Sequence, residues 1–131
     1  MLGNVAPPDE IVVADLEAGI GTLTRMSEKG VDAVLVVVEA TPKSLEVGVR
    51  AAALAEERSL GRLIVVANRV RGEEDLDVIR SAFPSQEMVT VPDDPAIPAA
   101  DRAGVAPLDA SPDAPAVRAL VDLGERLLEL L

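Results

Sequence analysis

The chain contains no cysteine, no histidine, no tryptophan and no tyrosine, and Phe83 is its one aromatic residue. Without cysteine and histidine, the chain can form neither a disulfide framework nor a Cys/His zinc site, and thiolate catalysis is excluded. No apolar run approaches the roughly 20 residues that a membrane-spanning helix requires. The first residues show no basic segment followed by an apolar stretch, so we expect no signal peptide and a cytoplasmic location.

Positive charge is also scarce, because 12 Lys and Arg residues stand against 23 Asp and Glu residues and give a net charge of −11. Such a surface repels phosphate backbones, which argues against direct binding of nucleic acid. The 131 residues suffice for a single domain over 1–131, and 49% of them are hydrophobic. Since aromatic residues are nearly absent, the core must consist of Val, Leu, Ile and Ala, which favours layered α/β packing.

Apolar segments alternate with turn-rich segments after an irregular lead-in predicted at residues 1–9. Apolar, largely β-branched runs predict four strands, at residues 10–15, 33–38, 62–67 and 88–91. Capping residues, helix breakers and apolar periodicity predict helices at 42–60, 73–83 and 112–131 and a shorter helix that ends at Gly30. Residues 95–110 are predicted to form a loop that includes at most one helical turn. The apolar stripe of the last helix is predicted to belong to the core and comprises Val117, Leu120, Val121, Gly124, Leu127, Leu128 and Leu131.

This alternation predicts right-handed βαβ units, and therefore a three-layer α/β/α fold with a mainly parallel sheet of about four strands. We expect the first three helices on one face of the sheet and the last helix on the other. In parallel sheets, ligands bind beyond the carboxyl ends of the strands. The polar residues at those ends are Asp15, Glu39, Asn68 and Asp93. Their common position predicts a binding site at this edge.

Two of the candidate residues follow the first predicted strand. Asp15 has the chemistry to hold a water molecule of Mg²⁺ beside a nucleotide, and it has equally the chemistry to cap the following turn. Gly19 can present its N–H group to a γ-phosphate, or it can make a tight turn together with Gly21.

The remaining candidates follow the later strands. The amide of Asn68 can both donate to and accept from an adenine edge, although an Asn at a strand end often bonds loop backbone instead. Pro92 and Asp93 can form a rigid border beside a base or an ordinary turn. Arg69 can meet a phosphate group, or it can pair with neighbouring carboxylates, as surface arginines of acidic proteins often do.

Taken in order, the motifs resemble one family. They read Asp-x-x-x-Gly-Ile, Val-Glu-x-Thr-x-x-Ser-Leu, Val-x-Asn-Arg-Val and Val-Pro-x-Asp-x-x-Ile-x-x-Ala-Asp-Arg-x-Gly. The chain from about residue 11 onward resembles the C-terminal half of MinD/ParA-type P-loop ATPases, most closely the CooC-type ATPases that mature the nickel site of carbon monoxide dehydrogenase. The residues that carry the resemblance are Asp15, Glu17, Ala18, Gly19, Ile20, Arg25, Glu39, Thr41, Ser44, Leu45, Asn68, Arg69, Val70, Pro92, Asp94, Ile97, Ala100, Asp101, Arg102 and Gly104.

The resemblance implies a role for each matching position. Asp15 matches the Walker-B aspartate, which acts on Mg²⁺ through water, and Gly19 matches the switch-II glycine beside the γ-phosphate. Asn68 matches the adenine-reading asparagine, and the adjacent Arg69 is a further candidate for contact with the nucleotide. The loop from Pro92 through Asp93 to Asp94 matches the border of the adenine site.

The chain also departs from the family. It has no Gly-x-x-x-x-Gly-Lys-Ser/Thr motif, and its two lysines, Lys29 and Lys43, stand outside any Gly-rich loop. A switch-I aspartate and the Cys-x-Cys metal pair of the CooC branch are missing as well. The resemblance thus implies a truncated P-loop fold without its phosphate-binding half. We expect weak binding of ATP or ADP with Mg²⁺ at most, and no ATP hydrolysis by these residues alone.

Two interpretations of function follow. The first is a degenerate or partial MinD/ParA/CooC-like ATPase that acts in protein assembly or metallocentre maturation. The second is a non-catalytic protein-interaction module that retains the fold without binding nucleotide. In either case we expect a homodimer, or a partner chain that completes the sheet beside strand 10–15, because an uncovered apolar edge promotes association.

Overall fold

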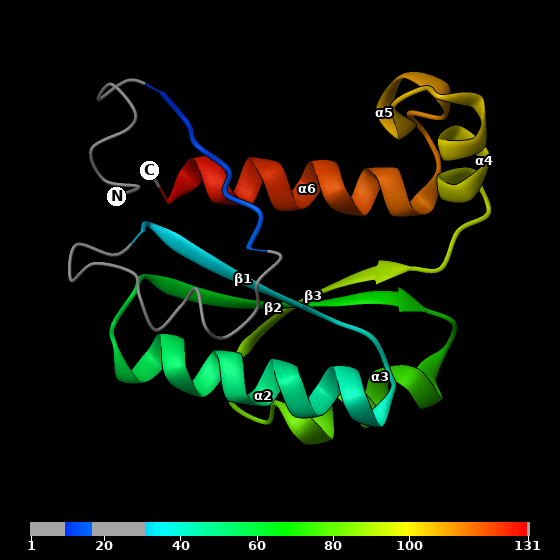
Figure 1. Cartoon of the computed structure of the whole chain (residues 1–131). Helices are drawn as coiled ribbons and strands as arrows, with labels where there is room; N and C mark the ends of the chain where they lie inside the picture. Colours follow the sequence, from blue (N-terminus) through cyan, green and yellow to red (C-terminus); the bar gives the residue numbers. More distant parts are fainter. Residues whose placement is uncertain (1–9, 17–30, 131) are drawn as a thin grey trace.

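The computed structural model of the chain describes residues 10–16 and 31–130. The strands within these residues form an open parallel sheet of three strands in the order β1-β2-β3, as Figure 1 shows. The strands are β1 (Ala33–Val38), β2 (Arg62–Val70) and β3 (Glu87–Pro92), and both neighbouring pairs run parallel. The fold class predicted from the sequence is therefore confirmed as α/β with a parallel sheet.

Two helices cover one face of this sheet. Helix α2 (Pro42–Glu57) begins where Thr41 accepts a hydrogen bond from Ser44 N, and helix α3 (Glu73–Ala82) begins with three acidic residues. Both helices pack on the face formed by the buried valines of β1 and by alternate residues of β2, and the resulting core includes Val38, Val65, Ile79 and Phe83. The β-branched residues of β1 and β2 thus build the larger of the two cores.

The last helix, α6 (Pro115–Glu129), covers the opposite face (Figure 1). Its Ala116 and Leu123 pack against Val66 of β2 and Val91 of β3. The structure therefore confirms that the last helix lies opposite the helices that follow β1 and β2. The short helix predicted to end at Gly30 and the lead-in at residues 1–9 lie outside the described residues.

The segment between β3 and α6 differs from the prediction. Instead of a loop it contains α4 (Ala96–Ala103), which ends at Gly104 in the left-handed conformation, and the short α5 (Pro107–Ala110). Helix α6 begins at Pro115 and not at residue 112, because the second of two nearby prolines occupies the first turn. Either proline suits that position, so the sequence does not choose between them.

The strand predicted at residues 10–15 does not form. Residues 10–16 have no regular secondary structure, and Val13 is 89% exposed. Leu16 is partly buried and packs against the larger core. The apolar run Ile11–Ala14 is short, and a strand is stable only where a neighbouring strand satisfies its backbone groups.

The predicted core stripe of α6 is also wrong in part. Leu120 and Leu128 are 45% and 56% exposed. The stripe that faces the sheet is rotated around the helix and comprises Ala116, Ala119, Leu123 and Leu127. Because α6 lies over β2 and β3, the side chains of Leu35 and Val37 on β1 remain exposed. Among the described helices, none has both the length and the apolar composition that a membrane span requires.

Candidate functional site

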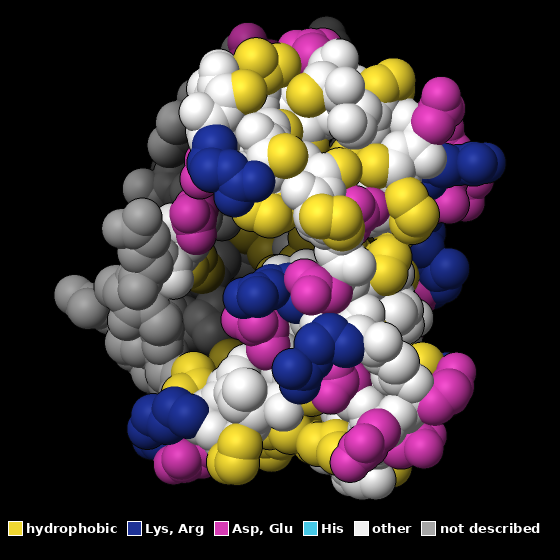
Figure 2. Space-filling model, turned by 90° about the vertical axis from the view of Figure 1, so that its right-hand side faces the viewer, with side chains coloured by type: hydrophobic (Ala, Val, Ile, Leu, Met, Phe, Trp, Pro, Cys, Tyr) yellow, Lys and Arg dark blue, Asp and Glu magenta, His cyan; other side chains and the backbone are white. Residues whose placement is uncertain are grey.

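The parallel strands place their carboxyl ends on one edge of the molecule, the face shown in Figure 2. Glu39 follows β1, Asn68 and Arg69 lie near the end of β2, and Asp93 follows β3. Basic and acidic side chains gather side by side in the middle of this face. We call this region the strand-end site. It contains most of the residues that the sequence nominated.

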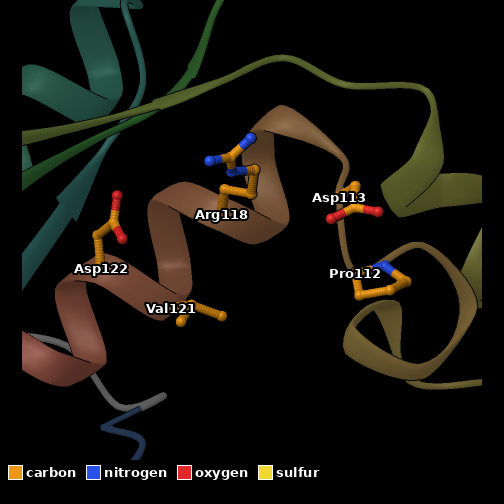
Figure 3. A pocket seen from close by; sticks show the side chains of 5 residues that line it. All are labelled: Pro112, Asp113, Arg118, Val121 and Asp122. Carbon is orange, nitrogen blue, oxygen red and sulfur yellow. The ribbon is translucent and has the colours of Figure 1, made fainter.

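A second surface feature lies on α6 and involves none of the nominated residues. It is a shallow hollow of about 240 Å³ lined by Pro112, Asp113, Arg118, Val121 and Asp122 (Figure 3). Three of its five side chains are charged, and Figure 3 shows them spread along the surface of the helix and the preceding turn. The apolar walls that bind a nucleoside base are lacking in this hollow.

A β-bulge shapes the strand-end site. Ala67 of β2 pairs with Thr90 of β3, but the next pair joins Val70 with Pro92. Asn68 and Arg69 therefore stand opposite Val91 alone. Arg69 adopts a left-handed backbone conformation with φ 54°. Bulges of this kind redirect side chains and occur often beside active sites.

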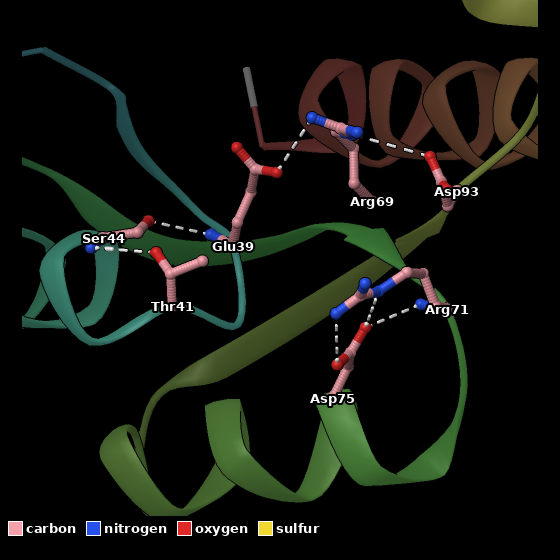
Figure 4. Close-up of polar contacts among 7 residues, drawn as sticks. All are labelled: Glu39, Thr41, Ser44, Arg69, Arg71, Asp75 and Asp93. Atoms are coloured by element: carbon pink, nitrogen blue, oxygen red, sulfur yellow. Dashed lines mark hydrogen bonds and ion pairs between the residues drawn. The ribbon is translucent and has the colours of Figure 1, made fainter.

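The redirected Arg69 joins the ends of all three strands, as Figure 4 shows. Its Nη1 atom lies 3.3 Å from Glu39 Oε1, and its Nε atom lies 3.5 Å from Asp93 Oδ1. The side chain of Arg69 is 65% exposed, that of Glu39 is 46% exposed and that of Asp93 is 44% exposed. Each ion pair therefore contributes at most about 1 kcal/mol of stability. The two pairs bring the three side chains together at the carboxyl edge of the sheet.

The two carboxylates stand on backbone that is itself fixed. The N–H group of Glu39 donates to Ser44 Oγ at 2.9 Å, and Ser44 N donates in turn to Thr41 Oγ1 at 3.3 Å. The N–H group of Asp93 donates to the carbonyl oxygen of Val70 at 2.9 Å. The start of α2 and the end of β2 thereby position the acidic groups on either side of Arg69.

Asp94 has a structural role beside the site. Its Oδ1 accepts a hydrogen bond from Ala96 N at 2.9 Å, and its Oδ2 accepts one from Ala116 N at 3.1 Å. These two bonds, the one from Ala96 foremost, lower the pKa of Asp94 below its ordinary value. One carboxylate thus fixes the first turns of both α4 and α6. A contact of Asp94 with a nucleotide stays a prediction.

A second arginine lies on the other side of β2 in Figure 4. Arg71 donates from Nε to Asp75 Oδ2 at 3.1 Å and from Nη2 to Oδ1 at 3.4 Å, and its backbone N–H donates to Oδ2 at 3.0 Å. The side-chain hydrogen bond of Arg71 is the main cause that lowers the pKa of Asp75, and the same bond raises the pKa of Arg71. The pair holds the start of α3 against the end of β2.

The other nominated residues are placed as follows. Asn68 is half-buried on the bulge and Pro92 ends β3, next to Asp93. Asp15 is exposed at the end of the irregular segment 10–16, and Gly19 lies outside the described residues. Within 10–16 and 31–130 no group of three or more acidic side chains is arranged to hold a metal ion. Binding of Mg²⁺ through Asp15 stays a prediction.

Sequence reasoning missed two supports of the site. Ser44 fixes the backbone of Glu39, a contact that the helix-start pattern Thr41-Pro42 does not reveal. Asp75 is also one of three acidic residues in the first turn of α3, where negative charge complements the helix dipole. Its spacing of four residues from Arg71 was a signal for the pair that the structure shows.

The fold and the strand-end site define an open parallel α/β protein with polar groups at the carboxyl edge, the place where such proteins bind ligands. The chain is 36% identical over 89 residues to an uncharacterized ATP-binding protein of Methanocaldococcus jannaschii, a match that covers 66% of this chain and 35% of the relative. It is 31% identical over 104 residues to the carbon monoxide dehydrogenase accessory protein CooC of Rhodospirillum rubrum, which covers 79% of this chain and 40% of CooC. No family model matches the chain.

These relatives confirm the resemblance that the ordered motifs predicted. The chain is homologous to a part of the CooC-like ATP-binding proteins. It spans 35% and 40% of the length of the two relatives named above.

Proposed function

We propose that this chain binds an adenine nucleotide at the strand-end site, as part of a CooC-like ATP-binding protein. The observation that carries the proposal is the position of Asn68 on the bulge, at the edge where the ends of β1, β2 and β3 meet. An amide at this point offers both a donor and an acceptor, which is the pattern of the adenine N6 and N7 edge. The ATP-binding relatives support this choice of ligand.

Hydrolysis is not part of the proposal for these residues alone. Lys43 lies on α2, where it is exposed and 3.8 Å from Glu46, and it does not belong to a Gly-rich loop. No backbone cradle of the P-loop type is encoded in the sequence, so the charge that develops on the phosphates during hydrolysis finds no such stabilisation. We propose that the chain contributes the base-binding part of a nucleotide switch in assembly or metallocentre maturation, with Asp15 acting on Mg²⁺ only when nucleotide is bound.

The binding test uses ¹⁵N-labelled protein titrated with adenosine, MgADP and MgATP while the amide resonances are followed. Saturable shifts at Asn68 and Asp93 are expected. Asn68→Asp keeps the shape of the side chain but removes its donor, and it should abolish most of the shifts. Gln86→Glu, the matched amide-to-acid change at the amino end of β3, should leave binding intact. Shifts that persist unchanged in Asn68→Asp would contradict the proposal.

The hydrolysis test measures release of inorganic phosphate from MgATP. We expect release no faster than in protein-free buffer. Release that is clearly faster with the wild-type chain and disappears in the Asp15→Ala variant would contradict the absence of hydrolysis.

A second candidate function is protein interaction without nucleotide. The observation that favours it is the exposed side of β1, where Leu35 and Val37 are 38% and 58% exposed although β1 borders the core. We propose that a second copy or a partner chain covers this strand, which pairs with β2 alone among the described strands. Sedimentation with interference detection suits a chain that lacks Trp and Tyr.

The interaction test compares two matched variants. Val37→Thr keeps the shape of the side chain on β1, and Val49→Thr makes the same change at an exposed position of α2. We expect Val37→Thr alone to weaken self-association. Equal effects of the two variants, or a monomer at every concentration, would contradict self-association through β1.

A further inference from the structure

Arg69 combines a left-handed backbone conformation with a position on a β-bulge. It adopts a left-handed backbone conformation, which few residues other than glycine do, and it does so on a bulge between two paired parts of β2. Such strain persists only where the surrounding structure enforces it. The contacts of the Arg69 side chain indicate its role at this point.

The guanidinium group of Arg69 is already engaged. Nη1 faces Glu39 at 3.3 Å and Nε faces Asp93 at 3.5 Å, so the two carboxylates approach it from the strands on either side of β2 (Figure 4). The three charges sum to −1, and an incoming phosphate group would have to displace at least one carboxylate against this negative charge. An arginine that serves as a ready phosphate ligand has a guanidinium group that is free before the phosphate arrives, whereas that of Arg69 is paired with Glu39 and Asp93.

We propose that Arg69 is a positioning residue that holds the ends of β1 and β3 at fixed places beside Asn68, and that it does not bind the phosphates of the nucleotide. The inference rests on the proposed function, in which Asn68 binds adenine. Because Asn68 and Arg69 share one bulge, the anchored Arg69 fixes the backbone from which the Asn68 amide projects. Loss of the guanidinium group should therefore affect recognition of the base.

The experiment compares dissociation constants for adenosine and MgADP by titration of ¹⁵N-labelled protein. Arg69→Met removes the charge and keeps the length of the side chain. It should weaken binding of both ligands by the same factor, about threefold to fivefold. Arg69→Lys should restore part of the affinity, and Glu39→Gln and Asp93→Asn should each cause a smaller loss of the same kind. A loss for MgADP with adenosine unchanged would overturn the proposal, because it would show a phosphate contact.

A second measurement needs no ligand and separates this inference from the proposed function. In the free protein, Arg69→Met should shift the amide resonances of both Glu39 and Asp93, and Glu39→Gln should shift that of Asp93 across β2. The comparison variant Arg71→Met removes the arginine that pairs with Asp75, and its largest shifts should fall on residues of α3, because the interactions of Arg71 with Asp93 and Glu39 are weaker than that with Asp75. If no nucleotide binds to any variant, the proposed function fails while these shifts still decide the role of Arg69. If the Asp93 amide resonance shifts in neither Arg69→Met nor Glu39→Gln, the proposed role of Arg69 is overturned.

Discussion

Gly48 of α2 lies so close to β1 that a Cβ atom at this position would be 2.3 Å from Cγ1 of Val38 and 3.3 Å from Cζ of Phe83. The absence of a side chain lets α2 approach the sheet directly beneath Val38, which is 1% exposed. Val38 is the last residue of β1 and precedes Glu39 of the strand-end site. The packing of Gly48 therefore bears on the position of the site as well as on the core.

We predict that Gly48→Ala destabilises the fold by roughly 1–3 kcal/mol, because the added methyl group must displace Val38. This destabilisation is expected although helix propensity favours alanine over glycine by about 1 kcal/mol. Urea unfolding followed by far-ultraviolet circular dichroism measures the effect in a chain without Trp or Tyr. Gly124→Ala on α6 is the matched control, since a Cβ atom there meets nothing within 4 Å, and it should stabilise the fold. Equal effects of the two substitutions would disprove the packing argument.

The left-handed conformation of Arg69 gives a second prediction. Arg69→Gly and Arg69→Ala remove the same ion pairs, but only glycine adopts φ 54° without steric cost. Arg69→Gly should therefore be more stable than Arg69→Ala by about 1 kcal/mol. Ser59, with φ 50°, is the positive control, and Ser59→Gly should stabilise the protein. The comparison uses urea midpoints, and an alanine variant at least as stable as the glycine variant would refute the backbone assignment.

The third prediction concerns acid stability through Asp94. Its pKa is lowered in the folded state from 3.8 by hydrogen bonds from the N–H groups of Ala96 and Ala116. Its stabilising contribution is therefore fully present above this ordinary value and is lost as the pH falls through the lowered pKa. Asp94→Asn offers one acceptor in place of two, so it should be less stable than wild type at neutral pH.

The difference between Asp94→Asn and wild type should shrink as the pH falls below 3.8. Urea midpoints across this pH range provide the measurement. Asp113→Asn, at an exposed position in the turn before α6, provides the comparison. A difference that is independent of pH would show that Asp94 acts without its charge.

The fourth prediction tests the support beneath Glu39. Ser44→Ala removes the acceptor of the Glu39 N–H group, a partly buried bond of 2.9 Å, and should cost about 1 kcal/mol of stability. Ser81→Ala removes a hydroxyl that donates to the Asp77 carbonyl on the exposed side of α3, and it should be nearly neutral. Thermal unfolding by circular dichroism distinguishes the two. If Ser44→Ala leaves the stability unchanged, a water molecule replaces the lost acceptor, and the prediction fails.

Much of the fold was predictable because its strongest signals are local. The run from Ala33 to Val38 is mostly valine and is buried on its α2 side, and Thr41 with Pro42 marks the start of α2. The prediction of a strand at 10–15 was wrong. Ile11 and Val13 supply the hydrophobicity of a strand, but a strand also needs a neighbouring strand to pair with, and a local pattern does not reveal one. The stripe predicted on α6 was wrong in part, because α6 has apolar residues on two adjacent faces, and only its position over β2 and β3 decides which of them is buried.

The strand-end site was predictable to the same degree. Glu39, Asn68 and Asp93 follow from the rule that parallel strands end on one edge. The bulge was not predictable, because nothing local to Asn68 and Arg69 distinguishes a bulged pair from a regular one. The sequence therefore nominated Arg69 without choosing between a phosphate and its carboxylate neighbours.

The double hydrogen bond of Asp94 has a consequence for engineering. One side chain ties Ala96 to Ala116 and so closes the intervening segment into a ring. The entropic cost of closing a ring grows slowly with the length of the ring, by about 0.6 kcal/mol for each doubling of that length. Gly104 is exposed within this segment, and a Cβ atom there meets nothing within 4 Å. A short peptide with a fluorescent residue, inserted after Gly104, would give this chain the optical label that its own sequence lacks, at little thermodynamic cost.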